Sequence, residues 1–259
     1  MVYYSIFVYF GGDFLERNYS SRINDGECHV WWANRFDAHP SLLSLINDLE
    51  KERYQSFCLQ EDQDRALVSY ALLRILLSKY LHMDPQEIPI DRTCPQCGKP
   101  HGKPYLTAPF YHHLEISVSH SGERIVIAIG RSPLGIDIEK IRMDLAIEEM
   151  IPAVLSPKER EDLYKAESWH YAFYTYWTRK EAITKAMGQG IVLPLTDIEV
   201  SGHREEPKFL SYKEDPDLPQ RFCMKDLDFG KEYHSSLAVM GPLKKVWIGN
   251  ASSLIDSFC

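Results

Sequence analysis

The sequence lacks any apolar run that approaches the ~18 residues of a membrane-spanning helix. Its first ten residues also lack the basic region and the small-residue cleavage site of a secretory signal. They are instead rich in β-branched and aromatic residues, which predicts a first strand over residues 1–10. We therefore expect a cytoplasmic protein whose thiols stay reduced.

The chain also has fewer basic than acidic residues: 29 Lys and Arg against 37 Asp and Glu, which gives a formal net charge of −8. Such a chain as a whole repels nucleic acid and acidic membrane surfaces, so we expect neither as a partner. Any phosphate that the protein binds must be met by a local basic pocket. The 259 residues can bury a substantial core and allow one large domain or two small ones.

Closely spaced cysteines are scarce: of the six, only Cys94 and Cys97 are near one another in sequence. With His101 they resemble half of a zinc site. The candidates for a fourth ligand are His82, His112 and His113. The simpler interpretation, which the sequence alone favours, is a loop with two free thiols.

The chain contains no short-period repeat, and its elements are predicted from hydrophobic periodicity. Helices are expected at 42–49, 62–81, 145–153, 157–166 and 169–187. Strands are expected at 115–119, 124–129, 135–139, 197–200, 233–240 and 244–248. The segment 91–109 is loop-like, and Gly188 and Gly190 are stop signals for the last helix. Both halves run from a long helix to strands, which favours a duplicated α+β architecture with a seam near 130–135. One continuous α+β domain is the alternative.

The strand Gly135-Ile-Asp-Ile-Glu139 carries two acidic side chains on one face, since alternate residues of a strand share a face. Asp137 and Glu139 repel one another unless a cation lies between them. Hard oxygen ligands of this kind suit Mg²⁺. A solvated acidic face on a half-exposed strand is the plainer interpretation.

Two further segments carry polar groups in an apolar setting. Glu181 and Lys185 share a face of the last long helix, whose apolar surround favours a cleft over open solvent. Ser119 and His120 end a strand just before the turn at Gly122, where donors could meet a phosphate. Each segment alone also fits a surface ion pair or a structural histidine.

Taken together, three segments resemble the signature of the 4′-phosphopantetheinyl transferases. They are Ser-Val-Ser-His-Ser at 117–121, Gly-Ile-Asp-Ile-Glu at 135–139 and Trp-Thr-x-Lys-Glu-Ala-x-x-Lys-x-x-Gly-x-Gly at 177–190. The resemblance covers about residues 62–200 and is loose at both ends. The chain length is similar to that of the larger monomeric, surfactin-synthetase-activating type, and not to the small trimeric holo-acyl-carrier-protein synthases.

The resemblance implies an α+β fold, a pseudo-dimer of two similar α+β subdomains with the active site in the cleft between them. We expect an N-terminal subdomain over 1–132 and a C-terminal subdomain over 133–259 that carries the metal ligands. The implied reaction transfers 4′-phosphopantetheine from coenzyme A to a serine of an apo acyl or peptidyl carrier protein. It releases adenosine 3′,5′-bisphosphate and depends on Mg²⁺.

The resemblance also assigns roles to single residues. Asp137, Glu139 and Glu181 match the positions that hold Mg²⁺. Glu181 matches the residue proposed to deprotonate the carrier serine, and Lys185 matches a lysine on the phosphates, so both are expected to be catalytic. The positions matching other coenzyme A contacts, besides Asp137 and Lys185, are Arg53, Arg65, Lys103, Ser119 and His120. Glu159 matches an acidic position near the active site, whereas Glu50 falls where a lysine is expected.

Two other functions use the same residues. One is a metal-dependent phosphoester hydrolase or nuclease, which overall acidity and the basic contacts disfavour. The other is a carrier-binding module without catalysis, which the presence of all three carboxylates and Lys185 disfavours. The sequence leaves open which carrier protein is served and whether acylated coenzyme A is accepted. The loop at 93–109 is a candidate docking region.

Overall fold

The computed structural model describes residues 7–11, 22–94, 96–111, 113–188 and 193–259. The chain divides into two compact units, of which the first is Met1–Arg131 with Lys244–Cys259 and the second is Ser132–Leu243. The sequence predicts a C-terminal unit that runs to residue 259, whereas 244–259 belong to the first unit. The reason is that the last strand pairs with strands of that unit.

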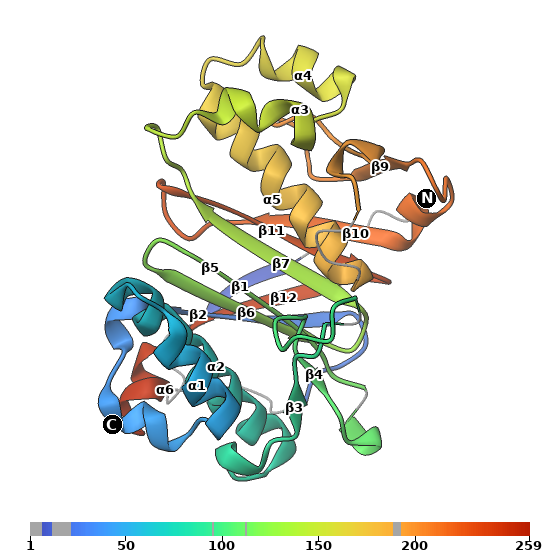
Figure 1. The fold of residues 1–259 in the computed structure, drawn as a ribbon. Helices are drawn as coiled ribbons and strands as arrows, with labels where there is room; N and C mark the ends of the chain where they lie inside the picture. The colour runs from blue at the N-terminus through green and yellow to red at the C-terminus, as the bar shows by residue number, and fades with distance from the viewer. Residues whose placement is uncertain (1–6, 12–21, 95, 112, 189–192) are drawn as a thin grey trace. The chain divides into compact units, whose positions relative to one another are not determined.

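The first unit is built on a five-stranded sheet of order β1-β12-β2-β6-β5 (Figure 1). Its strands are β1 (Phe7–Gly11), β12 (Lys245–Asn250), β2 (Glu27–Asn34), β6 (Arg124–Gly130) and β5 (Glu115–Ser121). β12 runs parallel to both of its neighbours, and the other pairs are antiparallel. A two-stranded sheet, β3 (Ile90–Asp91) with β4 (Tyr105–Leu106), lies within the segment expected to be a loop.

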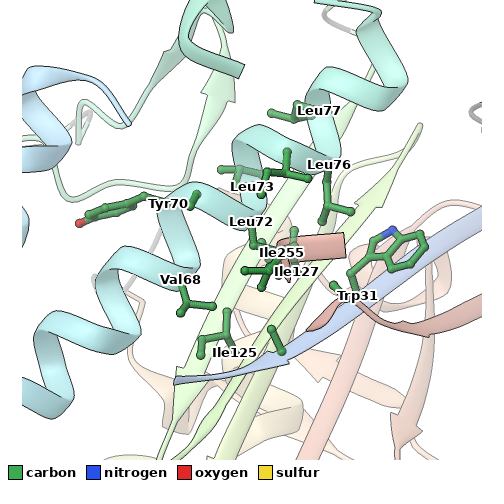
Figure 2. Packing of buried hydrophobic residues seen from close by; sticks show 14 of the residues in the cluster. Trp31, Val68, Tyr70, Leu72, Leu73, Leu76, Leu77, Ile125, Ile127 and Ile255 are labelled. Atoms are coloured by element: carbon green, nitrogen blue, oxygen red, sulfur yellow. The ribbon is translucent and has the colours of Figure 1, made fainter. Parts of the chain in front are cut away.

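The described residues of this unit form three α-helices: α1 (Asp48–Ser56), α2 (Gln60–Leu81) and α6 (Ser252–Asp256). α2 is apolar on most of its circumference and supplies the centre of the core. Figure 2 shows Leu72 and Leu76 of α2 beside Ile127 of β6. The helix ends at Leu81, and its C-cap residue His82 adopts the left-handed conformation.

The second unit is a three-stranded antiparallel sheet covered by one long helix (Figure 1). The strand order is β10 (Phe222–Leu227), β11 (Tyr233–Met240) and β7 (Leu134–Lys140). The helix α5 (Trp169–Met187) packs on β7 and β11. The smaller elements are α3 (Ile151–Val154), α4 (Pro157–Leu163), β8 (Ile198–Val200) and β9 (Phe209–Tyr212).

The two units share one order of elements. Each has an early strand (β2 or β7), a short capped helix (α1 or α4) and a long helix (α2 or α5). A two-stranded sheet (β3–β4 or β8–β9) and an antiparallel pair (β5–β6 or β10–β11) follow. In both units the early strand pairs with the second member of that last pair. The expectation of two similar α+β subdomains is thereby confirmed.

Most of the predicted elements are present with small shifts in their ends, and the helix at 169–187 has the expected bounds. The single helix expected at 145–153 is wrong, because a 3₁₀ helix at Ile147–Glu149 is followed there by the short α3. The helix expected at 42–49 is wrong: Pro40–Ser44 is a 3₁₀ helix, and α1 begins at Asp48 after an Asn47 cap. Of the strand expected at 1–10, residues 7–10 lie in β1 and 1–6 lie outside the described residues, as do Gly190 and His112. No helix in the described ranges combines the length and apolarity that crossing a membrane requires.

Candidate functional site

A close approach between β7 and α5 organises the acidic residues of the second unit. Gly135 faces the helix, and a Cβ built on it would lie 2.5 Å from the Ala186 nitrogen and 2.7 Å from the Lys185 Cβ. Real Cβ atoms essentially never come within 3.0 Å of such atoms. Because no larger residue fits, the glycine allows the backbone of α5 to lie against the strand. Residues 137 and 139 then face the same helix.

Asp137 forms an ion pair with Lys185 across this contact. Its Oδ1 lies 2.6 Å from the Lys185 Nζ, which also donates to the Ile136 carbonyl at 3.2 Å. Only 3% of Asp137 is exposed, and Ile136 and Ile138 are fully buried. The half-exposed, solvated strand that the sequence leaves open is therefore wrong for Asp137, because α5 covers the acidic face.

Glu181 is brought into electrostatic contact with the same pair. Burial raises the pKa of the Glu181 carboxyl, the negative charge of Asp137 raises it further, and Lys185 opposes the shift. Glu139 is half-buried near α5, where its charge adds to the effect of burial in raising the pKa of Tyr174. Asp137, Glu181 and Lys185 thus form one cluster, with Glu139 at its side.

A polar network lies under α5 beside this cluster. Thr178 Oγ1 lies 2.7 Å from His234 Nδ1 and 3.1 Å from the Ser236 hydroxyl. Ser236 donates to Asp226, which also pairs with the buried Arg179 at 2.6 Å. In the strand register, His234 is opposite Glu139 and Ser236 is opposite Asp137. The network therefore fixes the strand next to the two predicted metal ligands.

Glu159, which the resemblance places near the active site, is held inside the second unit. It accepts from the backbone nitrogens of Ser156 at 2.8 Å and Val200 at 3.0 Å. Lys180 lies 2.5 Å from it and also donates to two backbone carbonyls. Both side chains are buried, so their visible function is to hold α4 and α5 together.

In the first unit, two predicted coenzyme A contacts lie at the turn between β5 and β6. Ser119 is buried and His120 is exposed near the end of β5. Arg65 of α2 donates to the Gly122 carbonyl of the turn at 2.7 Å and pairs with Asp62. The structure therefore brings Arg65 to the turn that follows Ser119 and His120.

Lys103 and Arg53 lie at the Pro/Gly-rich segment. Lys103 pairs with Glu115 at 3.2 Å, and burial lowers the pKa of its ammonium group. Arg53 of α1 donates to the Pro100 carbonyl. Cys94, Cys97 and His101 of the same segment hold one possible ligand atom each within 4.8 Å of one another. Among the described residues, no other three His, Cys, Asp or Glu side chains are gathered that closely.

Comparison with known proteins identifies the family of both units. Residues 133–238 match the model of the 4′-phosphopantetheinyl transferase superfamily, and residues 31–131 match that of the N-terminal domain of these transferases. The chain belongs to the 4′-phosphopantetheinyl transferase family. The border between the two matches, 131 to 133, coincides with the border between the two compact units.

Curated relatives give the same result. A 4′-phosphopantetheinyl transferase of Bacillus subtilis is 29% identical over 73% of this chain and 86% of its own length. The transferase Sfp of B. subtilis strain 168 is 28% identical over 73% of this chain and 87% of its own. HetI of Nostoc sp. is 29% identical over 70% and 76%. This transferase is thus similar to the larger, Sfp-like type.

The sequence pattern identified the carboxylates of this transferase but not the buried polar residues that lie next to them. Thr178 stands inside the quoted motif, and its spacing on α5 could have marked it as a buried polar position. His234 and Ser236 carry no such signal, because they lie 56 and 58 residues after Thr178, in a separate strand. Only the pairing of β11 with β7 places them next to the acidic strand.

Proposed function

We propose that this transferase moves the 4′-phosphopantetheine moiety of coenzyme A to a serine of an apo acyl or peptidyl carrier protein, with Glu181, Lys185 and Asp137 as its reacting centre. The observation that carries the assignment is the cluster of these three side chains between β7 and α5. A monomeric state and a cytoplasmic location remain predictions.

The reaction is a substitution at phosphorus. The serine oxygen forms a bond to the phosphorus that bears the pantetheine arm, and the bond from this phosphorus to the bridging oxygen breaks. That oxygen leaves with adenosine 3′,5′-bisphosphate, and the serine proton goes to a base. The transfer asks the protein mainly for positioning and for neutralisation of charge.

Glu181 is the base in this proposal. A serine hydroxyl is a weak nucleophile until a base takes its proton, and a base works best when its pKa approaches the working pH. Burial and the neighbouring Asp137 both shift the pKa of Glu181 in that direction. Lys185 is already held beside Asp137. It would place a positive charge where negative charge develops on the phosphates during the transfer.

The carboxylate oxygens of Asp137, Glu139 and Glu181 are donors of the kind that magnesium binds, although they are not gathered as closely as the possible ligand atoms of Cys94, Cys97 and His101. The buried Asp137 and the half-buried Glu181 are hard oxygen donors, and their mutual repulsion is the kind that a divalent cation relieves. Glu139 is the third proposed ligand. Mg²⁺ bound there would neutralise charge on the pyrophosphate, an effect worth several kcal/mol in metal-dependent enzymes. Ser119, His120, Lys103, Arg65 and Arg53 are proposed to bind the nucleotide end.

The experiment is mass spectrometry of apo carrier proteins incubated with the transferase, Mg²⁺ and coenzyme A. A carrier that gains the mass of phosphopantetheine supports the function, and Glu181→Gln should abolish the gain. Glu148→Gln is the matched control, because this glutamate is exposed elsewhere in the same unit. Undiminished transfer by Glu181→Gln would contradict the site. Release of adenosine bisphosphate without any carrier would instead indicate a hydrolase.

A further inference from the structure

We propose that the first unit binds a zinc ion through Cys94, Cys97 and His101, with water as the fourth ligand. The three possible ligand atoms already lie within 4.8 Å of one another. Two thiolates and an imidazole are ligands that zinc takes readily, in tetrahedral geometry. Cys97 and His101 are exposed, so solvent reaches the remaining position.

The backbone around Cys94 is folded for such a site. The Gly98 nitrogen donates to the Cys94 carbonyl at 2.9 Å, and the Cys94 nitrogen donates to the Lys99 carbonyl at 2.8 Å. Gly98 has a φ of 70°, a conformation that favours glycine. The backbone N–H groups of Gln96 and Cys97 donate toward the sulfur of Cys94. This turn therefore holds the sulfur of Cys94 at the first ligand position.

The distances require only a small adjustment. Cys97 Sγ and His101 Nε2 lie 2.8 Å apart, as a hydrogen-bonded pair. Zinc bonds of about 2.3 Å to sulfur and 2.0 Å to nitrogen at a tetrahedral angle put these atoms roughly 3.5 Å apart. A shift of less than about 1 Å at two exposed side-chain ends admits the ion. Its binding releases the two thiol protons, and the imidazole ligates through its neutral Nε2.

A redox pair of thiols is the competing interpretation, since Cys94 and Cys97 have the spacing of a reversible disulfide. The position of His101 distinguishes the two. A disulfide needs only the two cysteines, whereas the ring nitrogen of His101 faces the sulfur of Cys97 as a third ligand would. The reducible pair is therefore an outcome of the test below.

The proposed ion would cross-link the segment 94–101, which hydrogen bonds from Gly102 and Arg53 already hold in place. The Gly102 nitrogen donates to the Arg92 carbonyl at 2.6 Å, and Arg53 donates to the Pro100 carbonyl. A Cβ on Gly102 would come within 3.1 Å of the backbone of residues 92–94, so the two arms of the loop lie against one another. Lys103 follows the ligand His101 by two residues. Zinc would hold this lysine in place. A benefit of this for coenzyme A binding rests on the proposed function, in which Lys103 contacts the coenzyme.

The test is the metal content of the full chain, purified without chelators and measured by inductively coupled plasma mass spectrometry. We expect one zinc per chain in the wild type and a background level in Cys97→Ser and in His101→Ala. Cys58→Ser is the matched control, because Cys58 is also an exposed free thiol but lies outside the segment. Circular dichroism establishes that each variant is folded.

Cobalt and thiol titrations complete the test. Co²⁺ added to zinc-free protein should give the sulfur-to-cobalt charge-transfer band of a tetrahedral thiolate site, and Cys97→Ser should lose it. Removal of zinc should make two more thiols reactive. A wild type that neither carries zinc nor competes for added Zn²⁺ with a colorimetric chelator overturns the proposal, as does a Cys94–Cys97 disulfide in freshly isolated protein.

These outcomes are separable from those of the proposed function. Zinc in a protein that fails to modify any carrier would leave the zinc site standing and remove the transferase assignment. Carrier modification by a protein that binds no zinc would do the reverse. With Mg²⁺ in excess, Cys97→Ser should raise the KM for coenzyme A and leave kcat near its wild-type value, as expected when the mispositioned Lys103 serves binding alone.

Discussion

Lys180 lies 2.5 Å from Glu159, and the pair has a counterpart in the other unit, Arg74 with Glu50 at 2.6 Å. In both pairs the glutamate belongs to the capping box of a short helix, α4 or α1. In both, the cation stands on the long helix that follows and gives its other protons to backbone carbonyls. An equivalent buried ion pair therefore joins α1 to α2 in the first unit and α4 to α5 in the second.

This correspondence extends the likeness of the two units from their topology to single residues. The residue that follows the buried cation is Ile75 in α2 and Glu181 in α5. Ile75 is fully buried in the core, whereas Glu181 faces Asp137 and Lys185. The two units thus share a scaffold, and at this position only the second has a carboxylate. Glu50, which falls where a lysine is expected from the family pattern, is instead the structural partner of Arg74.

The buried pair of the second unit should contribute strongly to the unfolding free energy. Glu159→Gln leaves the Lys180 ammonium in the interior without a counter-charge, which typically costs about 3–5 kcal/mol of unfolding free energy. Denaturant titration measures the loss. Glu161→Gln, an exposed position on the same helix, should change stability by less than about 0.5 kcal/mol. Equal effects from the two variants would refute the structural role.

Gly135→Ala should damage both stability and transfer. The added methyl group meets the backbone of α5, and overpacking of this kind typically costs about 1–3 kcal/mol. The helix must move from β7, which separates Lys185 from Asp137. Thermal unfolding and carrier modification are measured together. Gly202→Ala is the control, since its nearest neighbour is a Glu205 side chain at 3.4 Å. Full activity in Gly135→Ala would mean that the close approach is unimportant.

Asp137→Asn should weaken both metal binding and catalysis. The change keeps the shape of the side chain and removes the charge that holds Lys185. If the proposed metal contributes several kcal/mol, transfer should fall about 100-fold or more. The Mg²⁺ concentration for half-maximal rate should rise, which a magnesium titration measures. Asp144→Asn, at an exposed position, serves as control. An unchanged titration curve would argue against Asp137 as a ligand.

His120→Ala should act mainly on substrate binding. His120 is exposed on β5, beside the turn that Arg65 holds, and is proposed to contact the nucleotide end. Loss of one hydrogen bond to a charged group is worth about 1.5–3 kcal/mol, so the KM for coenzyme A should rise roughly 10-fold or more. Steady-state kinetics separate KM from kcat. A collapsed kcat with an unaltered KM would assign His120 to the chemistry instead.

The stability of the first unit should fall in mild acid because of His29. Burial lowers the pKa of this histidine from 6.5 to about 4, and its Nδ1 lies 2.8 Å from the Tyr80 hydroxyl. Below pH 6.5 the unfolded chain takes up a proton that the folded chain refuses until about pH 4. The unfolding free energy therefore decreases as the pH falls through this window, by about 2 kcal/mol at pH 5 from this group.

Denaturant titrations between pH 7 and pH 5 measure this effect, and His29→Gln should reduce the pH dependence by the same amount. His234, whose pKa burial also lowers to about 4, should add a loss of the same sign in both proteins. A variant with the full wild-type slope would show that His29 titrates normally in the folded state.

The amino-acid sequence by itself determined the elements whose information is local. The apolar periodicity of α2 and α5 fixes these helices, and the Ser156–Glu159 capping box begins α4 where the sequence predicts it. The alternation around Asp137 places Asp137 and Glu139 on one face of a strand. The spacing of the three motifs gave the family and the acidic residues, since both are properties of order along the chain.

Tertiary structure alone decided which residues meet. Strand β12 returns to the first unit because its pairing partners lie over two hundred residues earlier, which no local pattern encodes. His234 and Ser236 reach the acidic strand only through the register of β11, and Glu159 becomes a buried partner of Lys180 only when α4 packs on α5. Asp137 is buried because Gly135 lets a helix approach, and no pattern within the strand itself carries that contact.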